Sequence, residues 1–433
     1  MLQVVRRVRT TMTDTRLAID GGTPVRTRHL PIGRGAALLG DDEVTAAVEV
    51  LRARSLFRYY GPDLQLRVER FEQALCEHLG VARAVATSSG TAALRCALAA
   101  LGIGCGDEVV VPAFTFIATV NAVVSSGAVP VFAEVDESLN LDPARLADAL
   151  SERTVALIPV HLENVGADMD PIMDLARSRG LAVVEDAAQS MGATYKGRAL
   201  GTIGDVGAFS LQLEKNVTAG EGGVVTSNDD ALWLRAARFQ DQGGQFVTSV
   251  GGGRGGELDE PFLGENLRMT EIAGAIAEVQ LERLSGLLTA MRRNKGRILD
   301  AVGDLSGLEP RHRPDPDGDG SSSITWFAPD AAIAVGIVAA LRAEGIPAVQ
   351  FYDGKPVYAN EALLARRTAS NKGGPWHCAE HPCHVTYAMG MCPRTEALVA
   401  RNVTVGVGAL YTEDDCVDVA RAVRKVHAAL VGR

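Results

Sequence analysis

Short apolar runs that end in polar or small residues alternate with helix-like segments from Asp41 to about Arg283. The clearest examples are AVATSSGTAALRCALAALG, EVVVPAFTFIATVNAVVSSG, VALIPVHL and LAVVEDAA. Such alternation is typical of an α/β domain with a mostly parallel sheet. Because ligands of open α/β sheets bind beyond the carboxyl ends of the strands, the polar residues after these runs should converge on one crevice: Ser89, Thr91, Thr115, His161 and Asp186.

The rest of the chain is organised around long loops and one long helix. Residues 240–267 are polar and rich in glycine, which predicts a long loop. A helix is predicted from Thr270 to about Arg293. Strand-like and helical segments then indicate a second lobe, which ends in an amphipathic helix over 414–430. With a boundary near Leu287, we expect an N-terminal arm (1–40), a large domain (41–286) and a small C-terminal α/β domain (287–433).

The composition is that of a globular protein. The 433 residues are 47% apolar and 22% charged, which excludes a disordered or fibrous chain. A formal net charge of −10 provides no overall field to hold nucleic acid or an anionic membrane. Apolar stretches stay shorter than the roughly 18 residues of a membrane span, and the basic N-terminal stretch contains no signal-peptide core. We therefore expect neither a membrane protein nor a secreted one.

The cysteines and glycines contain patterns that resemble metal and nucleotide sites. Seven dispersed cysteines, an odd number, predict reduced thiols and a cytoplasmic location. A cluster near the C-terminal end lacks a second CxxC or HxxxH pair, so we expect a substrate or subunit-contact loop and no metal: His377, Cys378, His381, Cys383, His384 and Cys392. Gly251, Gly253 and Gly256 match GxGxxG, but no buried strand precedes them, which argues against a dinucleotide site.

Three segments combine residue types that suit one chemistry. SSGTAAL, residues 88–94, offers backbone N–H groups and a helix dipole to a phosphate, or is an ordinary helix cap. VVEDAAQS delivers Glu185 and Asp186 to the crevice, where a buried carboxylate needs a cation such as a protonated pyridine nitrogen; the alternative is a helix-capping Asp. In SLQLEKNVTAGEGG, burial beside a glycine-rich turn would lower the pKa of Lys215 and favour Schiff-base chemistry, whereas most lysines are solvated.

Six motifs in the same order resemble the DegT/DnrJ/EryC1/StrS family of sugar aminotransferases, which depend on pyridoxal 5'-phosphate (PLP). They are SSGTAAL, VPAFTFIATVNAV, PVHL with ADMDPI, EDAAQSMGATYKG, GDVGAFSLQLEKNVTAGEGGVV and GENLRMTEIAGAIAEVQLERL. The resemblance extends from about Leu17 to the C-terminal helix. It implies the fold of aspartate aminotransferase, fold type I of the PLP enzymes, with a large and a small domain.

The resemblance also implies roles for individual residues. Lys215 would form a Schiff base with PLP and shuttle the proton, and Asp186 would pair with the pyridine nitrogen. Asn266 would reach the phosphate of the neighbouring subunit, which implies a homodimer with shared active sites. The remaining cofactor contacts would come from residues that hold the phosphate, stack on the ring or lie beside it: Gly90, Thr91, Ala92, Ser210, Phe116 and Gln189.

The substrates implied by the resemblance are L-glutamate or L-glutamine as amino donor and a keto sugar as acceptor, in amino-sugar or antibiotic biosynthesis. We expect a nucleotide-activated sugar, and FRYYG with SLQLEKNVTAGEGG weakly resembles transaminases of eight-carbon sugars. A keto-inositol (aminocyclitol) acceptor is the main alternative. Relatives that are PLP-dependent sugar dehydratases carry His in place of the lysine, so Lys215 argues against that reaction. Lys215 and Asp186 also argue against a catalytically silent binding protein.

Four further residues are candidates for substrate contacts: Tyr60, His161, Glu163 and Arg268. Members of the family often carry a Tyr-Gly pair where this chain has Glu163 and Asn164, in HLENVGADMD. Glu163 either binds sugar hydroxyls or is a solvated loop carboxylate. Tyr60, in RYYG, either lines a sugar pocket or packs against the N-terminal arm.

Overall fold

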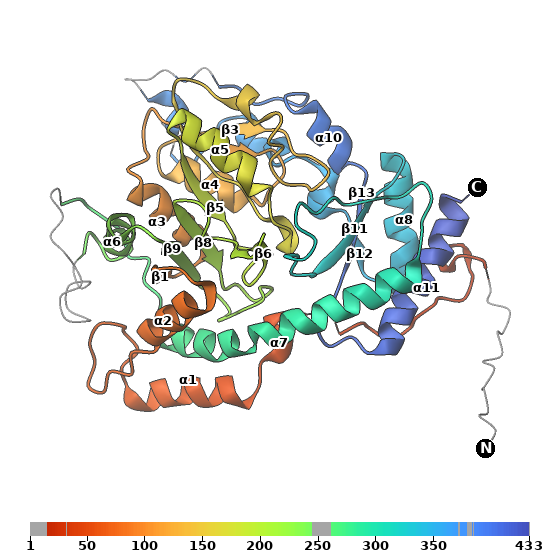
Figure 1. Ribbon diagram of the computed structural model, residues 1–433, viewed down its shortest axis with the longest axis horizontal. Helices are drawn as coiled ribbons and strands as arrows, with labels where there is room; N and C mark the ends of the chain where they lie inside the picture. Colours follow the sequence, from red (N-terminus) through yellow and green to blue (C-terminus); the bar gives the residue numbers. More distant parts are fainter. Residues whose placement is uncertain are drawn as a thin grey trace.

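The computed structural model describes residues 15–31, 33–244, 261–370, 373–378, 383 and 385–432. A large α/β lobe and a smaller lobe lie side by side, and the long helix α7 (Glu271–Val302) runs along both of them (Figure 1). Within the described residues, no helix has both the length and the apolar character needed to cross a membrane.

The large lobe is built on a sheet with strand order β1-β9-β8-β5-β4-β2-β3 in the described chain. β9 runs antiparallel to both of its neighbours, and the other strands are parallel to one another. The predicted mostly parallel sheet is therefore confirmed. Its strands are β1 (Arg83–Thr87), β2 (Glu108–Pro112), β3 (Val129–Ala133), β4 (Thr154–Leu157), β5 (Ala182–Asp186), β8 (Val206–Ser210) and β9 (Gly223–Ser227).

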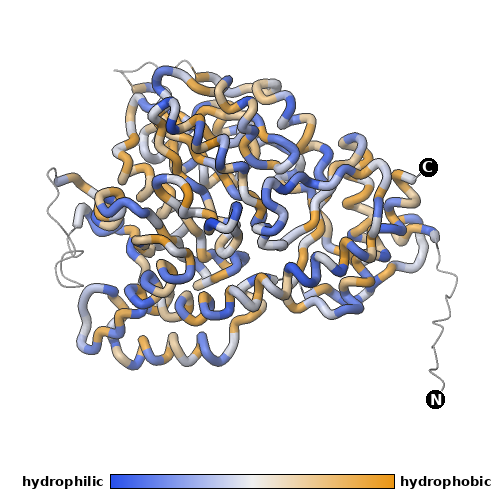
Figure 2. Tube along the Cα trace, in the orientation of Figure 1, coloured by the Kyte–Doolittle hydropathy of each residue, from blue (hydrophilic) through white to orange (hydrophobic). Residues whose placement is uncertain are grey.

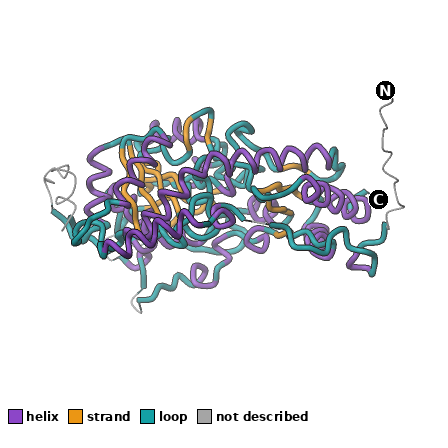
Figure 3. Tube along the Cα trace, turned by 90° about the horizontal axis from the view of Figure 1, so that it is seen from below, coloured by secondary structure: helices purple, strands orange, loops and turns teal. Residues whose placement is uncertain are grey.

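Helices cover both faces of this sheet, so the strands lie between helical layers in the view from below (Figure 3). One apolar cluster joins the sheet to α3, α4 and α6, a second joins it to α2 and α7, and a third involves α5. A short hairpin, β6 (Thr194–Tyr195) with β7 (Arg198–Ala199), follows β5. The helices are α1 (Asp41–Ala53), α2 (Arg67–Leu79), α3 (Gly90–Ala100), α4 (Ile117–Ser125), α5 (Met169–Arg179) and α6 (Asp230–Phe239).

The smaller lobe contains an antiparallel sheet of order β10-β11-β13-β12 in the described chain. Helices α8 and α11 pack against it and against each other. Its elements are β10 (Glu309–Pro310), β11 (Ser323–Phe327), α8 (Ala331–Ala343), β12 (Ala348–Val349), β13 (Asn402–Gly406) and α11 (Glu413–Leu430).

The N-terminal arm packs on the smaller lobe before it reaches the large one. Leu17 and Leu30 belong to the apolar core of the smaller lobe. The Glu344 carboxylate accepts hydrogen bonds from the backbone N–H groups of Ala18 and Val25, at 2.8 and 2.9 Å. The arm is thereby fixed to one lobe, while its continuation, residues 33–40, lies against the other.

Helix α7 is longer than the sequence predicts. The Thr270 hydroxyl caps its N-terminus by accepting from Ala273 N–H, as the predicted start requires. The helix continues past Arg293 to Val302, so the expected boundary near Leu287 falls within one continuous helix. Between Arg293 and Val302 the sequence contains no proline and a single glycine, Gly296, so the apolar spacing of a helix continues. Helix α2 buries an apolar stripe formed by Val68, Phe71, Leu75 and Leu79, and apolar and polar residues alternate along it (Figure 2).

Part of the region assigned to the small domain returns to the large lobe. Tyr358, Trp376 and Tyr387 are buried in the apolar cluster that surrounds β2 and β3, and the Tyr387 hydroxyl donates to the carbonyl oxygen of Pro130 at 2.7 Å. Two short helices belong to this part of the chain, α9 (Glu361–Leu364) and α10 (Pro393–Val399). From the sequence we expect one boundary between the two domains. In the structure the chain crosses between the lobes more than once.

The expectation that the cysteines are reduced thiols is wrong for one pair. Cys105 and Cys378 form a disulfide with 6.4 Å between their Cα atoms. They are 273 residues apart in sequence, so no spacing rule could have predicted that they pair. In the apparent metal cluster Cys378 is therefore occupied, while His381 and His384 lie outside the described residues. Among the residues that are described, no three His, Cys, Asp or Glu side chains form a group suited to a metal ion.

Candidate active site

Two adjacent residues at the end of β5 have side chains on opposite faces of the sheet, as the pleat of a strand requires. Glu185 accepts hydrogen bonds from His161 Nε2 at 2.9 Å and from the backbone N–H groups of Gly201 and Gly204 at 2.8 and 2.7 Å. Burial alone would raise the pKa of Glu185, but these donors lower it below its ordinary value. Glu185 is therefore a buried structural anion and does not face the crevice, contrary to the expectation from its position beside Asp186.

Asp186 is 5% exposed and lies next to the hydroxyl group of Thr119 on α4. One carboxylate oxygen accepts from Thr119 Oγ1 at 2.7 Å, and Thr119 Oγ1 lies 2.8 Å from Thr115 Oγ1. The other oxygen accepts from Ala188 N–H at 3.1 Å. Burial raises the pKa of Asp186, against the smaller opposite effects of Thr119, Ala188 and Lys215. Among the described residues Asp186 forms no ion pair, so a buried cation such as a protonated pyridine nitrogen would suit it.

Lys215 lies in the turn that follows β8, and its backbone carbonyl accepts from Gly35 N–H at 3.0 Å. Burial lowers the pKa of its amine, and the nearby Arg34 guanidinium acts in the same direction. Glu163 and Asp186 oppose this shift, so all three groups lie within electrostatic reach of the amine. Within the described chain no hydrogen bond or ion pair engages this amine. A desolvated amine with a lowered pKa is suited to Schiff-base formation and to proton transfer.

A small cradle lies at the N-terminus of α3, beside the end of β8. Ser89 caps the helix by accepting from Ala92 N–H at 3.1 Å, which occupies one of the donors expected to hold a phosphate. No described group accepts from the N–H groups of Gly90 and Thr91. A Cβ atom on Gly90 would lie only 2.7 Å from the Cβ of Ser210, so glycine is required for this close approach. The cradle combines free N–H groups, a hydroxyl and a helix N-terminus, which suits a phosphate.

An exposed aromatic ring and an amide complete this group of predicted residues. Phe116 precedes α4 and is 55% exposed, and its ring centroid lies 6.3 Å from that of Tyr352. Gln189 Nε2 donates to the Tyr352 hydroxyl at 3.2 Å. Tyr352 comes from the turn after β12, and no motif in the sequence distinguishes it. A planar ring could stack on Phe116, with Gln189 and Tyr352 beside it.

Arg34 is a second site residue that the sequence does not reveal. Its guanidinium forms an ion pair with the Glu163 carboxylate, and both side chains are 17% exposed. The Glu163 N–H donates to Gln189 Oε1 at 3.1 Å, which connects the pair to the predicted cofactor residues. Glu163 is therefore a paired carboxylate and not a freely solvated one.

His161 lies at a different position from that expected of a substrate contact. Its side chain is fully buried, with Nε2 hydrogen-bonded to Glu185 and Nδ1 accepting from Ala167 N–H at 3.1 Å. Both ring nitrogens are thus hydrogen-bonded in the buried interior. The backbone N–H of His161 donates to the Asp186 carbonyl at 3.1 Å, so the residue supports the strand that carries Asp186.

Tyr60, Asn266 and Arg268 belong to a separate cluster in the single chain. Arg268 pairs with the buried Asp241 at 2.8 Å and lies over the Phe57 ring at 5.2 Å. The Tyr60 ring packs on Phe57, with centroids 4.7 Å apart, and is 63% exposed. Asn266 is exposed, and its backbone bridges to that of Asp241. These three predicted residues therefore share a surface around Asp241 and Phe57.

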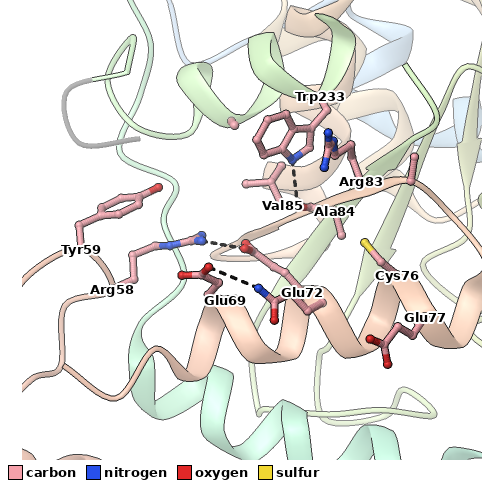
Figure 4. A pocket seen from close by; sticks show the side chains of 13 residues that line it. Arg58, Tyr59, Glu69, Glu72, Cys76, Glu77, Arg83, Ala84, Val85 and Trp233 are labelled. Atoms are coloured by element: carbon pink, nitrogen blue, oxygen red, sulfur yellow. Dashed lines mark hydrogen bonds and ion pairs between the residues drawn. The ribbon is translucent and has the colours of Figure 1, made fainter. Parts of the chain in front are cut away.

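A cavity of about 290 Å³ lies beside α2, β1 and α6 (Figure 4). Arg58 and Glu72 form an ion pair in its wall, and Trp233 Nε1 donates to the Ala84 carbonyl. None of the residues predicted to hold PLP lines this cavity. Apart from Asn266, the residues predicted to hold PLP lie instead at the carboxyl ends of the strands.

The residues at the strand ends fit PLP. Among the described residues, the buried Asp186 carboxylate has no ion-pair partner and the Lys215 amine has no hydrogen-bond partner. A glycine cradle lies at a helix N-terminus, and the Phe116 ring is 55% exposed. These features match the pyridine nitrogen, the aldehyde, the phosphate and the ring of this cofactor, respectively.

The sequence profile of the DegT/DnrJ/EryC1/StrS aminotransferase family matches residues 39–424, and the chain belongs to this family. The family is one of PLP-dependent sugar aminotransferases, which confirms the predicted enzyme class and cofactor. The predicted aspartate-aminotransferase-like fold is also confirmed. The structure superposes on that of DesI with its TDP-sugar product with a TM-score of 0.76 and 27% identity, covering 96% of this chain and 97% of DesI.

Two relatives illustrate the range of named activities. GDP-perosamine synthase of Caulobacter vibrioides is 44% identical over 236 residues, which are 53% of this chain and 60% of that enzyme. The L-glutamine:2-deoxy-scyllo-inosose aminotransferase of Streptoalloteichus tenebrarius is 33% identical over 432 residues, 95% of this chain and 97% of that enzyme. The match to the first relative thus spans less than two thirds of it, whereas the match to the second is almost complete.

Proposed function

We propose that this protein transfers an amino group from L-glutamate or L-glutamine to a cyclic keto substrate, using Lys215 and Asp186 as its central residues. The observation that carries the proposal is the buried Lys215 amine, which has no partner among the described residues and lies within electrostatic reach of the buried Asp186 carboxylate. Bound PLP supplies an electron sink for the bonds at the amine-bearing carbon.

The residues of this chain divide the remaining work. The Asp186 carboxylate fixes a positive charge on the pyridine nitrogen, and Thr119 holds that carboxylate in place. Gly90, Thr91 and Ser210 bind the phosphate, and the Phe116 ring supports the pyridine ring. The Lys215 amine takes a proton from the amine-bearing carbon of the donor, and in the second half of the reaction it returns a proton to the acceptor carbon. Its lowered pKa makes the neutral amine available at a lower pH than in an ordinary lysine, which favours both directions of proton transfer.

The acceptor we propose is a keto sugar carrying a nucleotide, as in the named product complex of DesI. A keto-inositol is a second candidate, which is favoured by the almost complete match to the 2-deoxy-scyllo-inosose aminotransferase. The eight-carbon sugar suggested by FRYYG stays a prediction, and so does the cytoplasmic location.

We also propose a homodimer in which each subunit completes the other's site. Asn266, Arg268 and Tyr60 form a cluster of their own around Phe57 and Asp241, and Leu263 in the same segment is 93% exposed. A second subunit would cover the exposed Tyr60 and Leu263 side chains and receive Asn266 at its phosphate cradle. Mixing Lys215→Ala with Asn266→Ala protein tests this, because only hybrid dimers would contain one intact site and regain activity.

The proposed function is tested by the absorbance spectrum of PLP-loaded protein before and after addition of L-glutamate or L-glutamine, with Lys215→Ala as a control. We expect one donor to convert the PLP spectrum to that of the pyridoxamine form in the natural protein only. A nucleotide-linked keto sugar and 2-deoxy-scyllo-inosose are then added separately, and the true acceptor restores the PLP spectrum. Consumption of a sugar without loss of amino donor would instead indicate a dehydratase.

A further inference from the structure

The ion pair of Arg34 and Glu163 lies beside Lys215, and both partners are attached to the site through their backbones. The residue after Arg34, Gly35, donates its N–H to the Lys215 carbonyl at 3.0 Å. A Cβ atom on Gly35 would lie 3.0 Å from that same carbonyl oxygen. The N-terminal arm therefore runs directly against the lysine, and this contact fixes the backbone next to Arg34.

Glu163 occupies an unusual backbone conformation that directs its carboxylate to Arg34. Its φ angle is 51°, and that of the next residue, Asn164, is 64°, both in the left-handed region that costs free energy for residues other than glycine. Gln189 accepts from the Glu163 N–H, and the Ser322 hydroxyl lies 3.1 Å from the Glu163 carbonyl and 3.3 Å from its carboxylate. Asn adopts this region readily, so the strain falls mainly on Glu163. Because backbone strain clusters at functional sites, Glu163 is a candidate for a role in the reaction.

The Arg34 guanidinium retains capacity for another anion. A guanidinium has five N–H donors, and Glu163 is its one partner among the described residues. Arg311, another enclosed cation, donates from Nε and Nη2 to the carbonyls of Ser138 and Leu162. Its Nη1 has no partner in the described chain, but Arg311 is not among the groups that most affect the Lys215 amine. Lys295 is paired with Asp319. Arg34 is also the cation with the largest influence on the Lys215 amine.

We propose that Arg34 binds the α-carboxylate of the amino donor, and that Glu163 is the counter-ion of Arg34 when the uncharged ring of the keto acceptor occupies the same place. This inference rests on the proposed function. In this proposal the Arg34–Glu163 pair allows one site to bind first an amino acid and then a polyhydroxy ring.

The chemistry of the two half-reactions requires such a device. The carbon that loses its proton to Lys215 also carries the donor's α-carboxylate, so this anion must lie close to the lysine amine. A charge-assisted hydrogen bond from a guanidinium is the strong way to hold it. The acceptor ring carries no carboxylate, and a half-buried guanidinium left without an anion would oppose its binding. Glu163 removes that penalty and offers its free oxygen to a ring hydroxyl.

The test compares PLP-loaded Arg34→Gln, Glu163→Gln and natural protein. Calorimetry measures the binding of 2-oxoglutarate, which carries the carboxylate but undergoes no turnover with the PLP form. Absorbance titration measures binding of cyclohexylamine, a cyclic amine without a carboxylate. A control variant, Arg283→Gln, removes an arginine that pairs with Asp42 on α1, outside the site.

The two variants should act in opposite directions on the carboxylate probe. Arg34→Gln should weaken 2-oxoglutarate binding about 10- to 100-fold and leave cyclohexylamine binding no weaker. Glu163→Gln should strengthen 2-oxoglutarate binding, by about 3- to 10-fold, and weaken cyclohexylamine binding, because Arg34 then lacks its counter-ion. Arg283→Gln should change neither.

Unchanged 2-oxoglutarate affinity in Arg34→Gln, or an equal loss for both probes, would overturn the inference, and so would weaker 2-oxoglutarate binding in Glu163→Gln. If Arg34→Gln does not fold, Glu163→Gln decides alone by the sign of its effect. Failure of the proposed function is distinguishable, since natural protein would then show no spectral conversion with either amino donor.

Discussion

Glu185 and Asp186 are neighbours in β5, yet the Glu185 carboxylate accepts several hydrogen bonds and the Asp186 carboxylate has no cation beside it in the described part of the chain. His161 and backbone N–H groups keep Glu185 ionised, whereas burial raises the pKa of Asp186. The strand pleat explains the difference, because it sends the first side chain into the structure beneath the sheet and the second toward Lys215. Two adjacent carboxylates thus have different surroundings: Glu185 is held by internal donors, and Asp186 is the one we propose to pair with the cofactor.

Replacing Asp186 by Asn should leave the fold intact and reduce transamination by about 10²- to 10³-fold, because the pyridine nitrogen loses the charge that stabilises it. Since the pKa of Asp186 is raised in the folded protein, ionising it costs stability as pH rises above the ordinary range of a carboxyl. PLP-free Asp186→Asn protein should therefore be more stable than the natural protein at neutral pH. Denaturation with and without PLP checks both statements: PLP should stabilise the natural protein more than the variant.

The reactivity of Lys215 should depend on pH in a way that its neighbours control. Its lowered pKa means that the neutral amine appears below the ordinary value of 10.5, so PLP capture should accelerate with pH up to a midpoint below that value. Arg34→Gln should move the midpoint upward, because the guanidinium lowers the pKa, and Glu163→Gln should move it downward. Capture rates followed by absorbance, compared between the proteins, measure these shifts. Equal midpoints in all three would contradict the electrostatic coupling.

The same shift predicts a pH-dependent stability of the PLP-free protein. Between the lowered pKa of Lys215 and 10.5, the unfolded chain binds more protons than the folded one, so the free energy of unfolding should rise with pH in this window. Lys215→Met removes the buried amine, and its gain over the natural protein should shrink toward pH 10.5. Urea denaturation at several pH values provides the comparison.

Gly90→Ala should weaken PLP binding by about tenfold or more, because the new methyl group would lie 2.7 Å from Ser210 Cβ and displace the hydroxyl from the cradle. Gly286→Ala is a matched control, since Gly286 lies within α7 and a Cβ there meets nothing within 4 Å. The control should bind PLP normally and gain up to about 1 kcal/mol in stability from the better helix former. Fluorescence titration with PLP distinguishes the two, and equal PLP affinities would disprove the cradle.

The sequence predicts the parts of the site that depend on local patterns. The alternation of strands and helices predicts the sheet. The buried strand before Asp186 and the glycine-rich turn after Lys215 predict two candidate residues, which the structure places within electrostatic reach of each other. His161 also follows a strand, but the pattern does not show that Glu185 holds its ring beneath the sheet. The spacing of apolar residues indicates which residues end a strand. It does not indicate which hydrogen-bond donors surround those residues in the folded protein.

Other parts depend on contacts between distant segments. Arg34 is in the N-terminal arm and Tyr352 is in the second lobe, and both reach Lys215 or Gln189 only through the tertiary fold. The continuation of α7 past Arg293 depends on its packing against α11, and the return of Tyr358 and Tyr387 to the large lobe depends on the apolar pocket around Phe132. No composition rule links these segments before they are folded.

The disulfide between Cys105 and Cys378 predicts the number of free thiols in the protein. Denatured protein that was never exposed to reductant should titrate with five free thiols, and reduced protein with seven, since the other five cysteines are unpaired. Because the bond joins segments 273 residues apart, a Cys105→Ser variant should lose about 2–4 kcal/mol of stability, with Cys76→Ser as a control at a partly exposed, unpaired thiol. Seven thiols without reductant would show that the pair stays reduced, which would restore the expectation drawn from the odd number of cysteines.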